Sequence, residues 1–164
     1  MKNFLFFFIF FIVSCGGVNF VYKDNVNLNN PIYNKTLVSF SGKTFPEFYR
    51  YASLYFGNTK ENFYGLNINI EEKKIKRSVQ SNQAISKMDY ELNFDYELFS
   101  ETERCIIYKK NILSRFSFEP KSSGYNFGSD QSLEKLYELA TKENFKRFVD
   151  FYANDKNTSC LNEG

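Results

Sequence analysis

In the stretch KMDYELNFDYELF, residues 87–99, polar and apolar side chains alternate from Lys87 to Leu98. Successive side chains of a β-strand point to opposite faces, so this pattern predicts a strand with one buried and one polar face. Four of the five polar residues on the second face are acidic. The apolar face carries Met88, Tyr90, Leu92, Phe94, Tyr96 and Leu98, and the polar face carries Asp89, Glu91, Asn93, Asp95 and Glu97.

A second strand is predicted over residues 106–118, joined to the first by a three-residue turn at 101–103. Opposite charges directly across such a ladder stabilise it by about 0.2–1 kcal/mol per pair. The basic residues of this strand are therefore interpreted as ladder partners of the acidic face, and Lys110 falls on the apolar face. The expected pairs are Asp95–Lys109 and Asp89–Arg115 on the polar side, and Leu98–Ile106 and Leu92–Ile112 on the apolar side.

Two further strands and two helices complete the pattern. Residues 37–41 and 64–70 are predicted as short strands, and beyond residue 70 the second either contains a bulge or runs past the core. Residues 45–56 have helical periodicity, with Thr44 and Glu47 as a capping box and Gly57 as the stop. Residues 132–154 form a longer helix. Its predicted inner side carries Leu133, Leu136, Tyr137, Ala140, Phe148 and Phe151.

This order of elements predicts an α+β fold: a two-layer sandwich with a four-stranded, mostly antiparallel sheet and two helices on one face. The polar face of the sheet then meets water or the polar interior of a partner. We expect a single α+β domain over residues 34–155 and a polar tail over 156–164.

The chain begins with one lysine and an apolar run, FLFFFIFFIV at residues 4–13, which is too short to span a bilayer as a helix. Its length and flanks are typical of a signal peptide. The residues Ile12, Val13, Ser14 and Cys15 resemble a bacterial lipobox, so we expect residues 1–14 to be removed and Cys15 to carry lipid. Residues 15–33 then form a lipidated tether. The alternative is an ordinary signal peptide with a bystander cysteine.

Composition excludes some functions and leaves others open. Without Lys2, the mature chain has 20 basic and 19 acidic residues, so charge indicates no polyanionic partner. The chain has no histidine, the commonest general base and zinc ligand, and we expect no metal or cofactor. Cys105 and Cys160 could bridge in an oxidising compartment, but no sequence signal places them together, so this disulfide stays open.

At this point the chain resembles the LptE family of lipopolysaccharide-assembly lipoproteins. The resemblance rests on the lipidated cysteine, the order of elements, the strand YELNFDY at residues 90–96 and the stretch RFSF at residues 115–118. It covers roughly residues 30–152.

The resemblance implies a lipoprotein of the cell outer membrane that faces the periplasm. Its partner would be the outer-membrane β-barrel that inserts lipopolysaccharide into the outer leaflet. The family plugs this barrel, helps it to fold, and binds lipopolysaccharide through basic residues near one end of the sheet. Carried over to this sequence, the lipopolysaccharide-binding residues are Lys74, Lys76, Arg77 and Lys121, with a solvated, charged strand end as the alternative.

Other classes of function are weighed against this one. A lipid-anchored periplasmic interaction or scaffold module of the cell envelope, with no lipopolysaccharide role, shares every physical feature above. An enzyme is not expected, because the sequence shows no nucleophile motif and its carboxylates are assigned to a paired sheet face. A location outside the cytoplasm and a near-neutral charge disfavour nucleic-acid binding.

Overall fold

The computed structural model describes residues 30–58, 63–79, 85–119, 132–155 and 159–161. Four strands form one open sheet in the order β1-β2-β3-β4. Strand β1 (Thr36–Gly42) lies parallel to β2 (Tyr64–Val79), whereas β3 (Ile85–Ser100) is antiparallel to both β2 and β4 (Cys105–Phe118). The predicted α+β class and the mostly antiparallel sheet are therefore confirmed.

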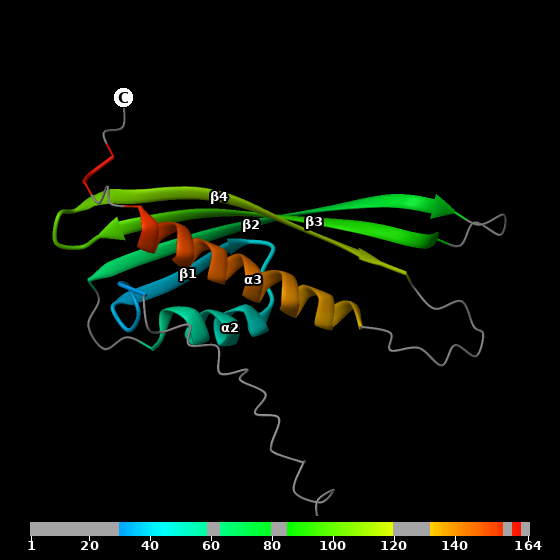
Figure 1. The fold of residues 1–164 in the computed structure, drawn as a ribbon, viewed down its shortest axis with the longest axis horizontal. Helices are drawn as coiled ribbons and strands as arrows, with labels where there is room; N and C mark the ends of the chain where they lie inside the picture. The colour runs from blue at the N-terminus through cyan, green and yellow to red at the C-terminus, as the bar shows by residue number, and fades with distance from the viewer. Residues whose placement is uncertain (1–29, 59–62, 80–84, 120–131, 156–158, 162–164) are drawn as a thin grey trace, which may run out of the picture.

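Helices α2 (Pro46–Phe56) and α3 (Leu133–Asn154) lie on one side of the sheet (Figure 1). The core forms between them and the apolar sheet face, on which Leu66, Leu92 and Phe94 are fully buried. The end of the sheet where β1 and β2 begin and β3 ends is called the proximal end. The end where β2 runs into residue 79 and β3 begins is called the distal end.

The start of α2 differs from the prediction. Phe45 takes the N-cap position, no side chain caps the helix, and Pro46 stands in its first turn. The expected capping box of Thr44 and Glu47 is therefore wrong, because proline, with its fixed φ, starts the helix one residue further along. Gly57 does end the helix, at a φ of 77°, and a Cβ there would lie 2.0 Å from Oδ1 of Asn34.

Helix α3 begins at Ser132, whose side chain accepts a hydrogen bond from the backbone N–H of Lys135. Its buried face is rotated from the predicted one. Phe148 is buried as expected, but Phe151 is 41% exposed, and the polar side chains of Thr141 and Asn144 are fully buried. The helix therefore packs through a stripe that hydrophobicity alone does not indicate.

Strand β2 extends well beyond the end of its neighbour β1. Pairing with β1 ends at Ile70, whereas pairing with β3 extends to Val79, with an irregularity at Arg77. The second predicted alternative is the correct one, since the strand runs past the part of the core under β1. The bulge comes later, near the distal end.

The β3–β4 register differs from the predicted one by two residues. Ser100 pairs with Cys105 across the four residues 101–104, and Leu98 pairs with Tyr108, which leaves Ile107 as an extra residue. A longer turn and a bulge therefore replace the expected three-residue turn. In place of the four predicted pairs, the structure has Glu97–Lys109, Glu91–Arg115, Leu98–Tyr108 and Phe94–Ile112.

The folded domain starts earlier than predicted. Ile32, assigned to the tether, is fully buried in the core, and the side chain of Asn30 donates to the backbone oxygen of Tyr55 at 2.5 Å. No helix within the described residues is both long enough and apolar enough to cross a membrane.

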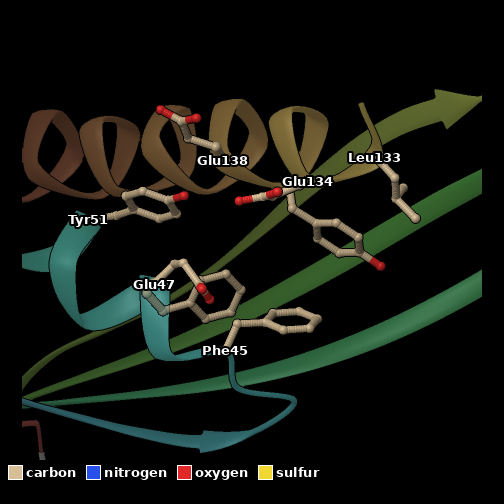
Figure 2. Close-up of a pocket in the computed structure, with 8 residues that line it drawn as sticks. Phe45, Glu47, Tyr51, Leu133, Glu134 and Glu138 are labelled. Atoms are coloured by element: carbon tan, nitrogen blue, oxygen red, sulfur yellow. The ribbon is translucent and has the colours of Figure 1, made fainter. Parts of the chain in front are cut away.

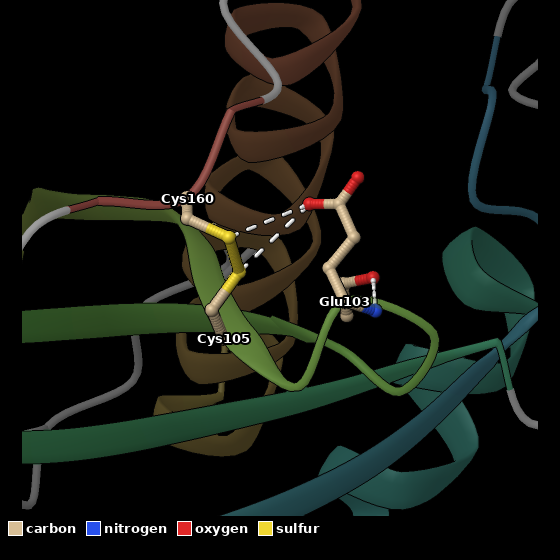
Figure 3. Close-up of a disulfide and its surroundings, with 4 residues drawn as sticks. Glu103, Cys105 and Cys160 are labelled. Carbon is tan, nitrogen blue, oxygen red and sulfur yellow. Dashed lines mark hydrogen bonds between the residues drawn. A yellow bond between two sulfur atoms is a disulfide. The ribbon is translucent and has the colours of Figure 1, made fainter.

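The polar tail is also tied to the domain. Cys160 forms a disulfide with Cys105, and the backbone N–H of Leu161 donates to the oxygen of Ile106 at 2.8 Å. Figure 3 shows the disulfide beside Glu103, whose Oε2 lies 3.8 and 3.6 Å from the two sulfur atoms. The question that the sequence left open is answered, and the tail is bound to the outer edge of β4.

Candidate functional site

The sheet face opposite the helices (Figure 1) is called the open face. It carries the polar side chains of the long strands. Alternation along the strands puts odd-numbered positions on this face for most of their length. Its polar side chains are mainly carboxylates, amides and bases. They include Asn67, Asn69, Glu71 and Lys73 on β2, Asp89, Glu91, Asn93, Asp95 and Glu97 on β3, and Lys109, Asn111, Arg115 and Ser117 on β4.

Side chains on neighbouring strands of the open face bind one another in pairs. The acidic face of β3 supplies the acceptor in each pair, and β2 or β4 supplies the donor. From the distal to the proximal end, the pairs are Arg77 with Asp89 (2.6 Å), Arg115 with Glu91 (2.9 Å), Asn111 with Asp95 (2.5 Å) and Lys109 with Glu97 (3.1 Å). The prediction that basic residues here partner the acidic strand is confirmed, with the partners shifted by the register.

Asp89 is the most constrained carboxylate of this ladder. The Ser117 hydroxyl donates to its Oδ1 at 2.6 Å, and Arg77 Nε donates to its Oδ2. The hydrogen bond from Ser117, followed by that from Arg77, holds the pKa of Asp89 below its usual value. Bonds to the charged form favour ionisation, so Asp89 remains an anion and keeps Arg77 folded against the sheet.

A hollow of about 490 Å³ opens at the distal end of this ladder. Its lining is Arg77, Asp89, Glu91, Arg115 and Ser117, together with Tyr90 and Phe116, whose rings pack against Tyr137 on the helix-covered side. Guanidinium groups form paired hydrogen bonds with phosphate or carboxylate. Both arginine side chains are more than half exposed, so an incoming anion can reach them. To bind both, it must compete with the two carboxylates.

The structure does not gather the four predicted lipopolysaccharide-binding residues at one point. Lys74 lies on the helix-covered side, 3.4 Å from Glu72 and over the ring of Tyr90. Lys76 is exposed two residues further along, whereas Arg77, at the register shift, binds Asp89 on the open face. Lys121, like the lipidation residue Cys15, lies outside the described residues.

Arg115 lines the hollow, although the sequence predicted only a ladder role for it. Its pairing with Glu91 confirms a ladder role, and the hollow adds a place beside Arg77. The predicted hairpin already places Arg115 and the basic run at residues 73–77 at the same end of the sheet. The predicted register, wrong by two residues, did not show that Arg77 and Arg115 bind the neighbouring carboxylates Asp89 and Glu91.

A second cavity, of about 330 Å³, lies between the first turns of the two helices (Figure 2). The rings of Phe45, Phe48, Tyr51 and Tyr137 form most of its wall, and Glu47, Glu134 and Glu138 stand around it. Carboxylates repel phosphate groups, so this cavity does not suit the head group of lipopolysaccharide.

The ionisable groups of this cavity are held by structural partners. Hydrogen bonds from Lys142 and then Lys135 lower the pKa of Glu138 to about 2. Burial, and then the hydrogen bond from the Tyr137 hydroxyl to Glu72, raise the pKa of Tyr137. The hydrogen bond of Tyr137 to Glu72 joins α3 to β2, whereas the two ion pairs of Glu138 lie within α3 itself.

Comparison with known proteins gives matches at the level of structure alone. No protein-family model matches the chain, and no curated protein matches it significantly. A proposed lipoprotein from Caulobacter crescentus CB15 has 12% identity and a TM-score of 0.47, covering 73% of this chain and 86% of its own.

Two further solved structures are similar. Rare lipoprotein B from Shewanella oneidensis has 12% identity and a TM-score of 0.44, over 71% of this chain and 92% of its own. A minor lipoprotein from Acinetobacter baumannii has 8% identity and a TM-score of 0.42, over 74% and 94% of the two chains. All three carry the word lipoprotein in their names, and at this level of superposition they do not assign a family.

Proposed function

We propose that this protein is a lipid-anchored lipoprotein of the outer membrane that helps to assemble, and then plugs, the β-barrel inserting lipopolysaccharide into the outer leaflet. The lipobox-like sequence ending at Cys15 supports the anchor. A diacylglyceryl group joined by an N-acyl chain supplies the two or more hydrocarbon chains that stable anchoring needs. The protein then works at the surface where such barrels are inserted.

The observation that carries the proposal is the open face. Four cross-strand pairs cover it with charged and amide groups, yet no helix in the described part of the chain packs on it. A sheet face of this kind is stable against water, and large barrels enclose a polar, water-filled lumen. Placing the open face against a lumen wall therefore leaves no charge in contact with hydrocarbon.

Lipopolysaccharide binding is proposed for the basic residues of the distal end, Lys74, Lys76, Arg77 and Lys121. Lysine and arginine donate charge-assisted hydrogen bonds to phosphate groups such as those of lipid A. Within this set the structure favours Arg77, because Arg115 lines the same hollow.

Charge reversal tests this assignment. The fourfold variant K74E/K76E/R77E/K121E should bind purified lipopolysaccharide more weakly than the wild type. The matched fourfold control K35E/R104E/K146E/R147E alters exposed basic residues at the proximal end and on α3, away from the distal hairpin, and should not. If the fourfold variant binds lipopolysaccharide with unchanged affinity, the lipopolysaccharide-binding part of the proposal is wrong.

Affinity purification of the tagged lipoprotein from native outer membranes tests the barrel partner. We expect a large lipopolysaccharide-handling barrel to purify with it in a 1:1 ratio. The alternative, an envelope scaffold module with no lipopolysaccharide role, predicts that other envelope proteins purify with it and that this barrel does not.

A further inference from the structure

An apolar row crosses the proximal end of the otherwise polar open face. Leu37, Gly65, Phe99 and Ile106 face one another in register across the four strands. Leu37 is 57% exposed. A Cβ at Gly65 would lie 3.6 Å from Oε1 of Glu101 and 3.9 Å from Cβ of Phe99, so these two side chains border the glycine. The row runs from β1 to β4, with Gly65 contributing no side chain to it.

Two more exposed apolar side chains extend this row. Phe63 precedes β2 and is fixed by backbone bonds to Lys35 and Glu101. Leu161 is placed beside Ile106 by its backbone bond and by the neighbouring disulfide, Cys105–Cys160 (Figure 3). The surface made by Leu37, Phe63, Phe99, Ile106 and Leu161 is called the end patch.

The end patch is a cluster and not a scatter of single residues. Three of the seven large apolar side chains that are exposed in the described chain, Leu37, Phe63 and Leu161, belong to it. The other four are distributed over the two helices. Isolated exposed apolar residues are ordinary, whereas a contiguous patch marks a surface that binds something.

The chain outside the described residues indicates what the end patch meets. Asn30 lies six residues before Thr36, where β1 starts at the proximal end. Cys15 lies 15 residues before Asn30. An extended chain of that length spans at most about 50 Å, so a lipid on Cys15 keeps the start of the domain, at the proximal end, within that distance of the membrane.

We propose that the end patch docks on the surface of the lipid bilayer that carries the anchor. This inference rests on the lipid anchor of the proposed function, and it describes the protein before it joins its barrel. Docking orients the sheet, with the distal hollow held away from the bilayer by the length of β2, roughly 50 Å for a strand of this size.

The charges around the end patch define the kind of membrane contact. Among the described residues, the exposed charged residues nearest to it in sequence, Lys35, Glu101, Glu103 and Arg104, sum to zero. Attraction to anionic lipids requires an excess of basic residues. Docking should therefore be driven by apolar contact and be insensitive to anionic lipid and to salt.

Vesicle co-sedimentation tests the proposal with the mature chain, residues 15–164, carrying C15A so that it has no lipid. The probe is a vesicle of phosphatidylcholine alone, compared with one that also contains phosphatidylglycerol. The variant L37S/F63S should bind about tenfold more weakly than the parent, since it removes two large apolar contacts. L37S alone should give a smaller loss.

A matched control distinguishes binding through the end patch from binding through exposed apolar side chains elsewhere on the surface. Y49S/L139S removes side chains that are 54% and 44% exposed on the helices, against 57% and 45% for Leu37 and Phe63. The control should bind like the parent. Reduction of the disulfide should weaken binding, because it releases Leu161.

Several results would overturn the docking proposal. They are absence of binding by the parent, equal loss in both double variants, a requirement for phosphatidylglycerol, loss of binding at high salt, or self-association through the patch in place of vesicle binding. The assay contains neither barrel nor lipopolysaccharide, so its failure leaves co-purification with the barrel untouched. Failure of that co-purification leaves this assay untouched in turn.

Discussion

Asn144 is the polar residue on which the packing of α3 depends most. It is fully buried, accepts from the Tyr96 hydroxyl at 2.5 Å, and donates to Ser114 Oγ at 2.7 Å and to the Ile112 oxygen at 3.1 Å. One amide thus joins the helix to β3 and to the edge strand β4. Sequence periodicity assigned no role to Asn144, because an asparagine in a helix is usually a solvent-facing residue, and only the three-dimensional arrangement reveals its partners.

Replacing this amide tests its role. N144L should lower the free energy of unfolding, since each buried group left without a partner costs about 1–3 kcal/mol. T141V is the control, because Thr141 is buried on the same helix and its hydroxyl has no hydrogen-bond partner. We expect T141V to unfold in urea like the wild type. Equal losses in the two variants would show that the effect is steric.

Glu138 makes the stability of α3 depend on pH. Its pKa in the folded state is about 2, below the usual carboxyl value of 4.5, so its ion pairs are complete above about pH 5 and are lost as pH falls toward 2. Removing them with E138Q should cost about 0.5–1 kcal/mol at neutral pH, as expected for surface pairs. The difference between E138Q and the wild type should vanish near pH 2. A difference that is constant over this range would refute the assignment.

At the scale of elements, the β3–β4 hairpin shows how far sequence reasoning reaches. The strands, their buried faces and the acid–base pairing follow from alternation, because odd-numbered and even-numbered side chains of a strand point to opposite faces. The register does not follow, since it depends on the length of the turn and on the extra residue Ile107. Lys110, unexplained on the apolar side, lies over the ring of the half-exposed Phe151 at 4.5 Å.

A double-mutant cycle distinguishes the two registers. Glu91 and Arg115 are paired in the structure, whereas a three-residue turn would pair Asp89 with Arg115. The coupling free energy between E91Q and R115Q should be about 0.2–1 kcal/mol in chemical unfolding. Coupling between D89N and R115Q should be smaller. The reverse order would contradict the observed register.

At the scale of the whole molecule, the disulfide closes the structure. It joins residues 55 apart, so it encloses β4 and α3 and holds the tail at the proximal end. The sequence showed an even pair of cysteines but not their proximity, because that depends on where α3 ends relative to the start of β4. The fold class, by contrast, followed from the order of elements.

Removing the disulfide should reveal its contribution. C105S/C160S is expected to lower the free energy of unfolding by about 2–4 kcal/mol, the usual range for a cross-link of this span. The wild type measured in reducing buffer should match the variant. Identical unfolding curves for the oxidised wild type and the variant would show that the bridge adds nothing to stability.

In the proposed function, the open face works against the inner wall of a lipopolysaccharide-inserting barrel. In vivo photo-cross-linking from Asn67 tests this directly, because Asn67 is an exposed open-face residue of β2. A photoreactive amino acid at that position should give a cross-linked product that contains the barrel. Cross-links only to other envelope proteins, or none, would contradict the account.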